Sequence, residues 1–356
     1  MFVMPVRRLL PLTLLALLML PAAARASSGM EFALQDDDVF VHQQGYDRDR
    51  ALDHALALGA TRIRVNVLWA RLLVSGGATN PVYDFSAIDS LQEEAADRGI
   101  DLQLTIAGPA PSWATRNHKV GNVAPDPSRY GAFVHTVATH FKGKVDRYSI
   151  WNEPNWKSWL EPQKESPRLY RGLYGAGYRA VKGVDPRAEV LMGELAPNGG
   201  GKAIAPLKFL RDMFKGAKPM KADGFAMHPY QLTSAPNQVV AGKPDDVSIG
   251  TLPRLTTALD ALYKTHKLQT SKGRKLDLYL TEFGYLTAGS RKQSQARIAN
   301  WLVAAIDVAR KNKRVKQLLQ YQLIDPPKTA LWHSALLTRK GAPQKAYNAL
   351  VRALNP

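Results

Sequence analysis

The stretch that decides the fold is Ser149-Ile150-Trp151-Asn152-Glu153-Pro154-Asn155. Residues 145–150 overlap the start of this stretch. Their apolar side chains follow the pattern of a strand that is covered on both faces. Pro154 lacks the backbone N–H that a strand needs to continue its ladder, so the strand must end at or near Glu153. A carboxylate and an amide, those of Glu153 and Asn152, are thereby placed together at the carboxyl end of a buried strand.

The carboxylate of Glu153 also lies between two tryptophans, Trp151 and Trp156, which is an unusual setting for a solvated loop. Burial or half-burial there would raise the pKa of Glu153 toward the range that a general acid needs. The alternative interpretation is a surface turn that happens to hold a glutamate.

A second stretch of the same kind follows later in the chain: Leu278-Tyr279-Leu280-Thr281-Glu282-Phe283-Gly284-Tyr285. It is again an apolar, β-rich run that ends in a carboxylate, that of Glu282. Two carboxylates at the ends of two strands are what acid/base-assisted cleavage of a glycosidic bond requires, because one must protonate the leaving oxygen while the other attacks or stabilises the sugar cation. This partner argues against the surface-turn interpretation of Glu153.

Four short motifs resemble the retaining glycoside hydrolases of clan A, in particular families 39 and 5. They are the Trp-Asn-Glu-Pro run at Glu153, the Thr-Glu-Phe-Gly run at Glu282, an arginine on the second strand (Arg64), and a His-x-Tyr pair on the sixth strand (His228 and Tyr230). Each motif is short, but the four follow the clan's order and span most of the chain. Together they are fairly specific.

The resemblance implies a role for each matched residue. Glu153 would be the acid/base and Glu282 the nucleophile, while Asn152 would hold the hydroxyl next to the anomeric carbon. Arg64 and Tyr230 would donate hydrogen bonds to Glu282 and keep it ionised, as a nucleophile must be. An arginine that points into a barrel is also costly unless it meets a carboxylate, and Glu282 is the natural partner for Arg64.

Further side chains are expected near the sugar. By the same resemblance, His228 and Trp332 would shape the sugar-binding subsite, with the indole face stacked on the ring. Trp113, on the loop after the third strand, would line the cleft, although a packing role is nearly as well supported. Glu194 also ends a strand-like run, but it lacks the neighbouring amide and aromatic residue. We therefore assign the chemistry to the other two glutamates.

Alternation of strands and helices predicts an α/β fold, a (β/α)8 TIM barrel, in one domain over residues 27–356. A doubly wound sheet is the structural alternative, but it should bring a Gly-rich phosphate loop, and the sequence has none. Strands are predicted at 30–34, 61–68, 101–106, 145–150, 189–192, 224–227, 278–282 and 315–323. Helices are predicted at 47–58, 84–98, 126–141, 167–184, 207–214, 253–266, 294–311 and 344–354.

The first 26 residues are predicted to be a secretory signal peptide. Arg7 and Arg8 form a basic region, residues 9–20 are apolar, and Ala24-Arg25-Ala26 is a small-x-small cleavage site. The apolar run is too short for a membrane span, so no membrane insertion is expected. We expect cleavage after Ala26 and export of residues 27–356 to the periplasm or the extracellular space. The chain has no cysteine, which excludes a lipid-anchored form, disulfides and thiol chemistry.

The mature chain is strongly basic. Removing Arg7, Arg8 and Arg25 from the 48 basic residues leaves 45 against 30 acidic ones, a formal net charge of about +15. Such a field favours anionic partners: cell-wall polymers, acidic polysaccharide or nucleic acid. The basic runs 271–275 and 311–314 precede predicted strands and carry no interleaved aromatic residues, so we interpret them as solvated surface and expect no nucleic-acid binding.

Metal sites are not expected, and neither is a cofactor. The sequence contains no His-Glu-x-x-His motif and no paired metal ligands. A calcium site at Asp36-Asp37-Asp38 is conceivable, but no EF-hand spacing follows, which favours a polar loop at the barrel mouth.

The sequence thus predicts a secreted, monomeric retaining glycoside hydrolase that cleaves a polysaccharide or oligosaccharide by a two-glutamate double displacement. Its competitor is a non-catalytic sugar-binding or cell-wall-associated barrel, which predicts a degraded carboxylate pair. The sequence leaves the sugar, and exo- or endo-action, open.

Overall fold

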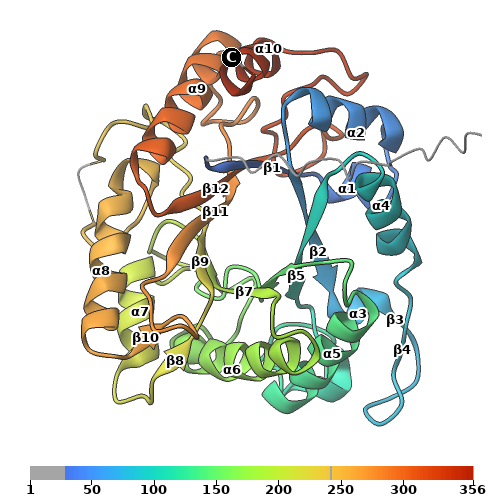
Figure 1. The fold of residues 1–356 in the computed structure, drawn as a ribbon, viewed down its shortest axis with the longest axis vertical. Coiled ribbons are helices and arrows are strands. Elements are labelled where there is room, and N and C mark those ends of the chain that lie inside the picture. The colour runs from blue at the N-terminus through green and yellow to red at the C-terminus, as the bar shows by residue number, and fades with distance from the viewer. Residues whose placement is uncertain (1–28, 241–242, 356) are drawn as a thin grey trace, which may run out of the picture.

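Eight parallel strands close into a barrel in the computed structural model, which describes residues 29–240 and 243–355. The strand order around the barrel is β1-β12-β11-β9-β7-β6-β5-β2. Helices surround the strands on all sides (Figure 1). The predicted (β/α)8 barrel is therefore confirmed. The signal-peptide prediction for residues 1–26 lies outside the described residues. Among the residues that the structure describes, no helix is long and apolar enough to cross a membrane.

The barrel strands agree with the predicted ones to within a few residues. They are β1 (Glu31–Gln35), β2 (Arg62–Leu68), β5 (Asp101–Ala107), β6 (Arg147–Ile150), β7 (Glu189–Leu195), β9 (Gly224–Met227), β11 (Asp277–Phe283) and β12 (Val315–Tyr321). Two small pairs lie outside the barrel: β3 (Leu73–Ser75) with β4 (Val82–Tyr83), and β8 (Met220–Lys221) with β10 (Leu268–Gln269).

The outer helices also occur where the periodicity predicts them. They are α2 (Arg48–Ala57), α4 (Ser86–Ala96), α5 (Pro127–His140), α6 (Ser166–Val184), α7 (Pro206–Phe214), α8 (Leu252–Lys264), α9 (Gln295–Lys311) and α10 (Lys345–Leu354). Two short helices, α1 (Asp37–Phe40) and α3 (Trp69–Leu72), follow β1 and β2. The first of these replaces the polar loop that was predicted after β1.

Local sequence explains where several helices begin. The side chains of Asp47, Asp126 and Ser294 each accept a hydrogen bond from the backbone N–H three residues on, which caps α2, α5 and α9. Proline occupies the first turn of α5 to α8, where a missing N–H costs nothing.

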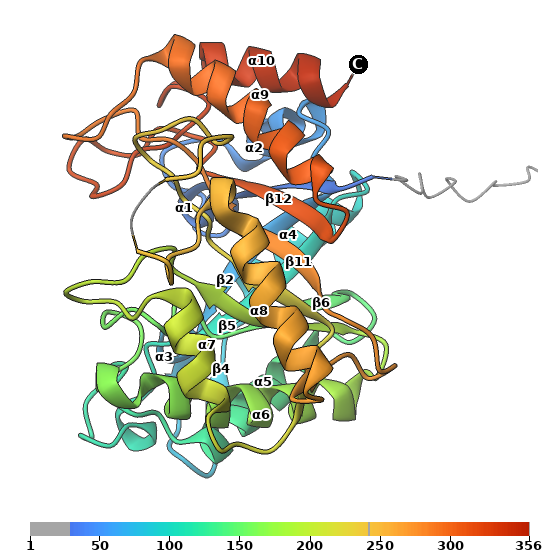
Figure 2. The same ribbon diagram turned by 90° about the vertical axis from the view of Figure 1, so that its left-hand side faces the viewer.

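The last helix joins the two ends of the chain. Figure 2 shows α10 beside α9, above α2. Tyr347 on α10 donates a hydrogen bond to the carbonyl of His54 on α2, and Asn355 donates to the carbonyl of Ala57. These contacts hold the ring of helices closed around the strands.

Charged side chains fill much of the barrel interior, in two separate sets. At the amino-terminal end of the strands, the guanidinium of Arg147 contacts Glu31, Glu189 and Gln317. Toward the carboxyl-terminal end, Arg64 is fully buried and contacts the carboxylates described below. Because a buried charge is costly unless it is paired, each guanidinium requires carboxylates from other strands of the barrel.

Candidate active site

The two predicted carboxylates meet at the carboxyl end of the barrel. Glu153 follows β6, and Glu282 lies near the end of β11. Three atoms lie within 4.8 Å of one another: a carboxylate oxygen of Glu153, a carboxylate oxygen of Glu282 and a ring nitrogen of His228. The side chains of Glu153 and Glu282 are only 9% and 14% exposed. The two strand-end motifs therefore bring their carboxylates together, nearly withdrawn from water.

Arg64 is the cation nearest this pair. Its Nη1 lies 2.7 Å from Glu282 Oε1, so the expected ion pair is present. Its Nη2 donates to Asn152 Oδ1 at 2.8 Å and also lies 3.1 Å from Glu194 Oε2. Its Nε donates to the Thr105 hydroxyl at 2.8 Å. The guanidinium thus binds two carboxylates, of which sequence reasoning found only one.

His228 is fully buried among three glutamates. Its Nε2 lies 2.7 Å from Glu194 Oε2, and its Nδ1 lies 3.0 Å from Glu153 Oε1 and 3.6 Å from Glu282 Oε2. Burial alone would lower the pKa of His228, but Glu282, Glu153 and Glu194 outweigh it and raise the pKa to about 10. His228 is therefore an imidazolium at neutral pH that donates both N–H groups.

The surroundings shift the pKa values of two of these glutamates, Glu153 and Glu194, in opposite directions. Burial raises the pKa of Glu153, and Glu282 adds to that effect, against the opposing influence of His228. Burial would also raise the pKa of Glu194, but Arg64 and His228 hold it down at about 2. Arg64 and His228 both contact Glu194 Oε2, whereas of these two cations only His228 contacts Glu153.

Tyr230 and Asn152 complete the surroundings of the pair. The Tyr230 hydroxyl donates to Glu282 Oε2 at 3.1 Å, and burial followed by the nearby Glu282 charge raises the pKa of Tyr230 well above its ordinary value. The phenol therefore stays a donor. Asn152 Oδ1 accepts a hydrogen bond from Arg64, and its NH2 group, at the edge of the cavity, forms no hydrogen bond with the described residues.

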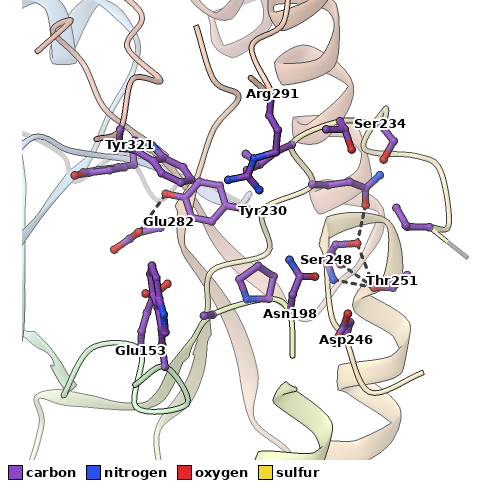
Figure 3. A pocket seen from close by; sticks show the side chains of 18 of the residues that line it. Glu153, Asn198, Tyr230, Ser234, Asp246, Ser248, Thr251, Glu282, Arg291 and Tyr321 are labelled. Carbon is purple, nitrogen blue, oxygen red and sulfur yellow. Dashed lines mark hydrogen bonds between the residues drawn. The ribbon is translucent and has the colours of Figure 1, made fainter. Parts of the chain in front are cut away.

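A cavity of about 490 Å³ opens over the carboxylates (Figure 3). Trp332 lines it and packs edge-on against Tyr230, with ring centroids 5.0 Å apart. Trp156 and Trp159, on the loop that follows Glu153, line it as well and were missed. Their position directly after the Asn-Glu-Pro motif was the signal that could have identified them.

Two predicted sugar-contacting residues lie elsewhere. Trp113 does not line the cavity; it packs edge-on against Trp69, with centroids 5.6 Å apart, and beside the Arg129 guanidinium. These contacts agree with the packing alternative, and a role for Trp113 in lining the cleft stays a prediction. His228 does not line the cavity either; it is fully buried, and glutamates bind both of its ring nitrogens.

Among the described residues, one group of side chains has the spacing of metal ligands: Glu153, His228 and Glu282. In this structure the three side chains contact one another directly: His228 Nδ1 lies 3.0 Å from Glu153 Oε1 and 3.6 Å from Glu282 Oε2. The aspartates after β1 do not converge: Asp36 accepts from the backbone N–H groups of Leu323 and Ile324, whereas Asp37 binds Asn66. The structure does not assemble the conceivable calcium site there.

Comparison with known proteins places the fold. No protein-family model matches this chain, and no curated protein matches it. Solved structures do, among them a family 39 glycoside hydrolase from the gut symbiont Bacteroides cellulosilyticus WH2, with a TM-score of 0.71 and 18% identity over 91% of this chain. The fold is that of clan A glycoside hydrolases.

Two further structures agree. A family 39 enzyme from Xanthomonas axonopodis pv. citri has a TM-score of 0.62 at 18% identity over 90% of this chain. A broad-specificity family 5 endoglucanase from Clostridium acetobutylicum has a TM-score of 0.60 at 14% identity, over 92% of this chain and 97% of its own. The chain spans 63% and 65% of the two family 39 proteins. The resemblance read from the four motifs is confirmed for the fold.

Proposed function

We propose that this protein is a secreted retaining glycoside hydrolase, with Glu153 as acid/base and Glu282 as nucleophile. The observation that carries the proposal is the closeness of the two carboxylates, with an oxygen of each within 4.8 Å. Retaining enzymes hold their carboxyl groups about 5–5.5 Å apart, whereas inverting enzymes keep about 6.5–9.5 Å to admit a water molecule. The short gap favours double displacement.

In the first step, a Glu282 oxygen attacks the anomeric carbon while Glu153 gives its proton to the departing glycosidic oxygen. The products are a free alcohol and a glycosyl ester of Glu282. In the second step, Glu153, now a carboxylate, takes a proton from water as that water attacks the anomeric carbon and releases Glu282. The sugar leaves with its original configuration, and both glutamates return to their starting states.

The neighbouring residues prepare each glutamate for its role. Arg64 binds one oxygen of Glu282 and Tyr230 the other, which favours the ionised nucleophile and fixes its direction. Burial raises the pKa of Glu153, which suits a general acid. The NH2 group of Asn152, which lines the cavity, would bind the hydroxyl next to the anomeric carbon.

The test is a screen of the purified protein against aryl glycosides and polysaccharides, with NMR of the first product formed. We expect turnover with retained anomeric configuration, and none from Glu282→Ala. An inverted product would overturn the mechanism. Binding of a sugar without turnover would favour the competing non-catalytic barrel. The same panel separates exo- from endo-action, because an exo-acting enzyme releases single units from the chain end.

An anionic polymer fits the outer part of the cavity best. Three cations line it: Lys243, Arg254 and Arg291. In the described part of the chain none forms an ion pair with a carboxylate, and Lys243 and Arg254 donate to backbone carbonyls. Figure 3 shows Arg291 pointing into the cavity. Asp246 lies on the opposite side of the cavity from Arg291. We propose that the substrate bears carboxylate or sulfate groups. Arg291→Gln should then weaken turnover of an acidic polysaccharide and spare its neutral analogue.

Export is proposed on the amino-terminal sequence alone. Mass spectrometry of the protein recovered outside the cytoplasm should find Ser27 as its first residue. An unprocessed amino terminus in that fraction would contradict cleavage after Ala26.

A further inference from the structure

Three glutamates contact His228, but the proposed reaction uses only two of them. The third, Glu194, is fully buried and does not line the cavity. Its Oε2 accepts from three donors: Arg64 Nη2 at 3.1 Å, His228 Nε2 at 2.7 Å and the Thr281 hydroxyl at 2.6 Å. A carboxylate with three donors at one oxygen and no access to the cavity is held in place for an effect on its neighbours.

The backbone of β7 is built to bring Glu194 into the barrel. Its register with β9 shifts between Gly193 and Leu195, where Gly193 has a φ of +118° and Glu194 a φ of +51°. A Cβ at position 193 would come within 2.3 Å of the Ala226 carbonyl, so only glycine fits. A positive φ is unfavourable for a glutamate. The surroundings evidently enforce this conformation.

The same kink reaches the acid/base through a second contact. The carbonyl oxygen of Glu194 accepts a hydrogen bond from the backbone N–H of Glu153 at 2.9 Å. Glu194 is therefore linked to Glu153 twice, through its own backbone and through the His228 ring, whose other nitrogen binds the Glu153 carboxyl group.

We propose that Glu194 is a positioning residue that anchors His228 as a doubly hydrogen-bonded imidazolium and thereby fixes the orientation and protonation of Glu153. The inference deepens the proposed function, because the glycosidase role assigned to Glu153 is part of it. The anchor itself is a property of the folded chain, so it can be measured without a substrate.

The charges around His228 define the expected effect of removing this anchor. Glu153 faces its Nδ1 from β6, Glu194 its Nε2 from β7, and Glu282 approaches Nδ1 from β11. Arg64, from β2, lies on the far side of Glu194 and opposes the imidazolium charge. Without the Glu194 charge, Arg64 loses one counter-ion and His228 loses its shortest hydrogen bond to an anion. Both changes favour release of the imidazolium proton.

The experiment is a pH titration of the His228 ring in the full chain by ¹H–¹⁵N NMR, with the signals assigned from their loss in His228→Gln. In wild type we expect both ring nitrogens to stay protonated through neutral pH. In Glu194→Gln, which keeps the shape and removes the charge, the midpoint should fall by at least one pH unit, about a tenfold change in proton affinity. Glu189→Gln is the matched control, since Glu189 lies on the same strand and pairs with Arg147 at the other end of the barrel.

An unchanged midpoint in folded Glu194→Gln would overturn the inference. Should that variant fail to fold, Glu194→Asp keeps the charge but shortens the side chain, and it should give a smaller shift in the same direction. On a cleaved substrate, Glu194→Gln should lower kcat with little change in KM, because Glu194 does not touch the cavity. An inactive wild type with the expected His228 shift would contradict the glycosidase proposal and leave the anchor standing. If wild type is active but Glu194→Gln changes neither the titration midpoint of His228 nor kcat, the inference about Glu194 is contradicted and the glycosidase proposal stands.

Discussion

Both ends of the barrel hold a buried arginine between two glutamates, yet only one end is suited to chemistry. At the amino-terminal end, Arg147 binds Glu189 at 2.7 Å and Glu31 at 2.5 Å. The side chains of these glutamates are 39% and 27% exposed. Water therefore reaches both carboxylates, and the set has the properties of a structural ion-pair network.

At the carboxyl-terminal end, Arg64 binds Glu282 and Glu194, whose side chains are 14% and 0% exposed. Here a buried histidine and a third carboxyl group, that of Glu153, are added, and a cavity lies above them. A buried ion pair therefore does not by itself indicate a functional site. Perturbed protonation beside a cavity does.

The largest expected effect separates the two ends by activity. Glu282→Ala should abolish turnover even of aryl glycosides with good leaving groups, because no covalent intermediate can form. Glu189→Ala, at the other end, should retain turnover in the folded protein. Initial rates for both variants test the contrast. Comparable losses of turnover in the two folded variants would contradict the assignment of the chemistry to the carboxyl-terminal end alone.

Glu153→Ala should have the next largest effect, and it should depend on the substrate. Loss of a general acid typically costs about 10²–10⁴-fold, but substrates with good leaving groups need little protonation and should be partly spared. Added azide should rescue these substrates and give a glycosyl azide with retained configuration. Inverted azide product from this variant would require the roles of Glu153 and Glu282 to be exchanged.

Removing either arginine should destabilise the fold, but only one should alter the pH profile. Breaking a buried pair from one side costs about 3–5 kcal/mol, so Arg64→Ala should lower the melting temperature strongly. Arg147→Ala should cost less, because its partners are partly solvated. Arg64→Ala should also move the acidic limb of kcat/KM to higher pH, since the nucleophile has lost its nearest cation and ionises less readily. Arg64→Lys should give a partial effect on both measures.

The control for this prediction is the folded Arg147→Ala protein, whose acidic limb should stay in place. An unshifted limb in folded Arg64→Ala would mean that Arg64 has a structural role alone.

Sequence reasoning reached the barrel and its two strand-end glutamates because both are set by local pattern. Strand and helix periods fix the alternation, and Pro154 excludes a strand beyond Glu153, which follows the end of β6 at Ile150. It missed the inward position of Glu194 for a physical reason. Glu189 and Leu191 face the barrel interior, so a period of two turns residue 194 toward the helices. The kink at Gly193 and Glu194 reverses that direction, and no pattern in the strand announces it.

Side-chain depth was equally hard to predict. The motif at His228 indicates a site residue, but whether the ring meets the cavity or lies below it depends on which neighbours occupy its nitrogens. Trp113 was placed at the cleft from its position after the third strand, whereas the fold turns it onto Trp69. Loop direction is set by tertiary packing, which residue spacing does not encode.

Stability should depend on pH through His228 in a defined direction. Its pKa is about 6.5 in an unfolded chain and about 10 in the folded protein. The contribution of His228 to the free energy of unfolding is therefore fully present below pH 6.5 and is lost as the pH rises toward 10. Its magnitude is on the order of a few kcal/mol, at about 1.4 kcal/mol per pH unit with a reduction for the coupling to three glutamates.

Urea unfolding of wild type and His228→Gln across this range measures the loss as a difference. A substitution of His54 on α2 is the matched control. Burial has the larger effect and the charge of Arg50 the smaller one, and both lower the pKa of His54. Its contribution has the opposite sign: it is present above pH 6.5 and lost as the pH falls. Parallel stability curves for wild type and His228→Gln would contradict an imidazolium in the folded state.

The smallest expected effect concerns the two tryptophans that the sequence treated alike. Trp332 lines the cavity beside Tyr230, whereas Trp113 packs on Trp69 outside it. An aromatic contact is worth about 0.5–1.5 kcal/mol beyond the area it buries. Trp332→Ala should therefore raise KM about 2–10-fold and leave the melting temperature nearly unchanged. Trp113→Ala should lower the melting temperature and leave KM unchanged. Steady-state kinetics and melting curves of both variants form a crossed test, and a KM that rises in Trp113→Ala at full stability would return this residue to the cleft.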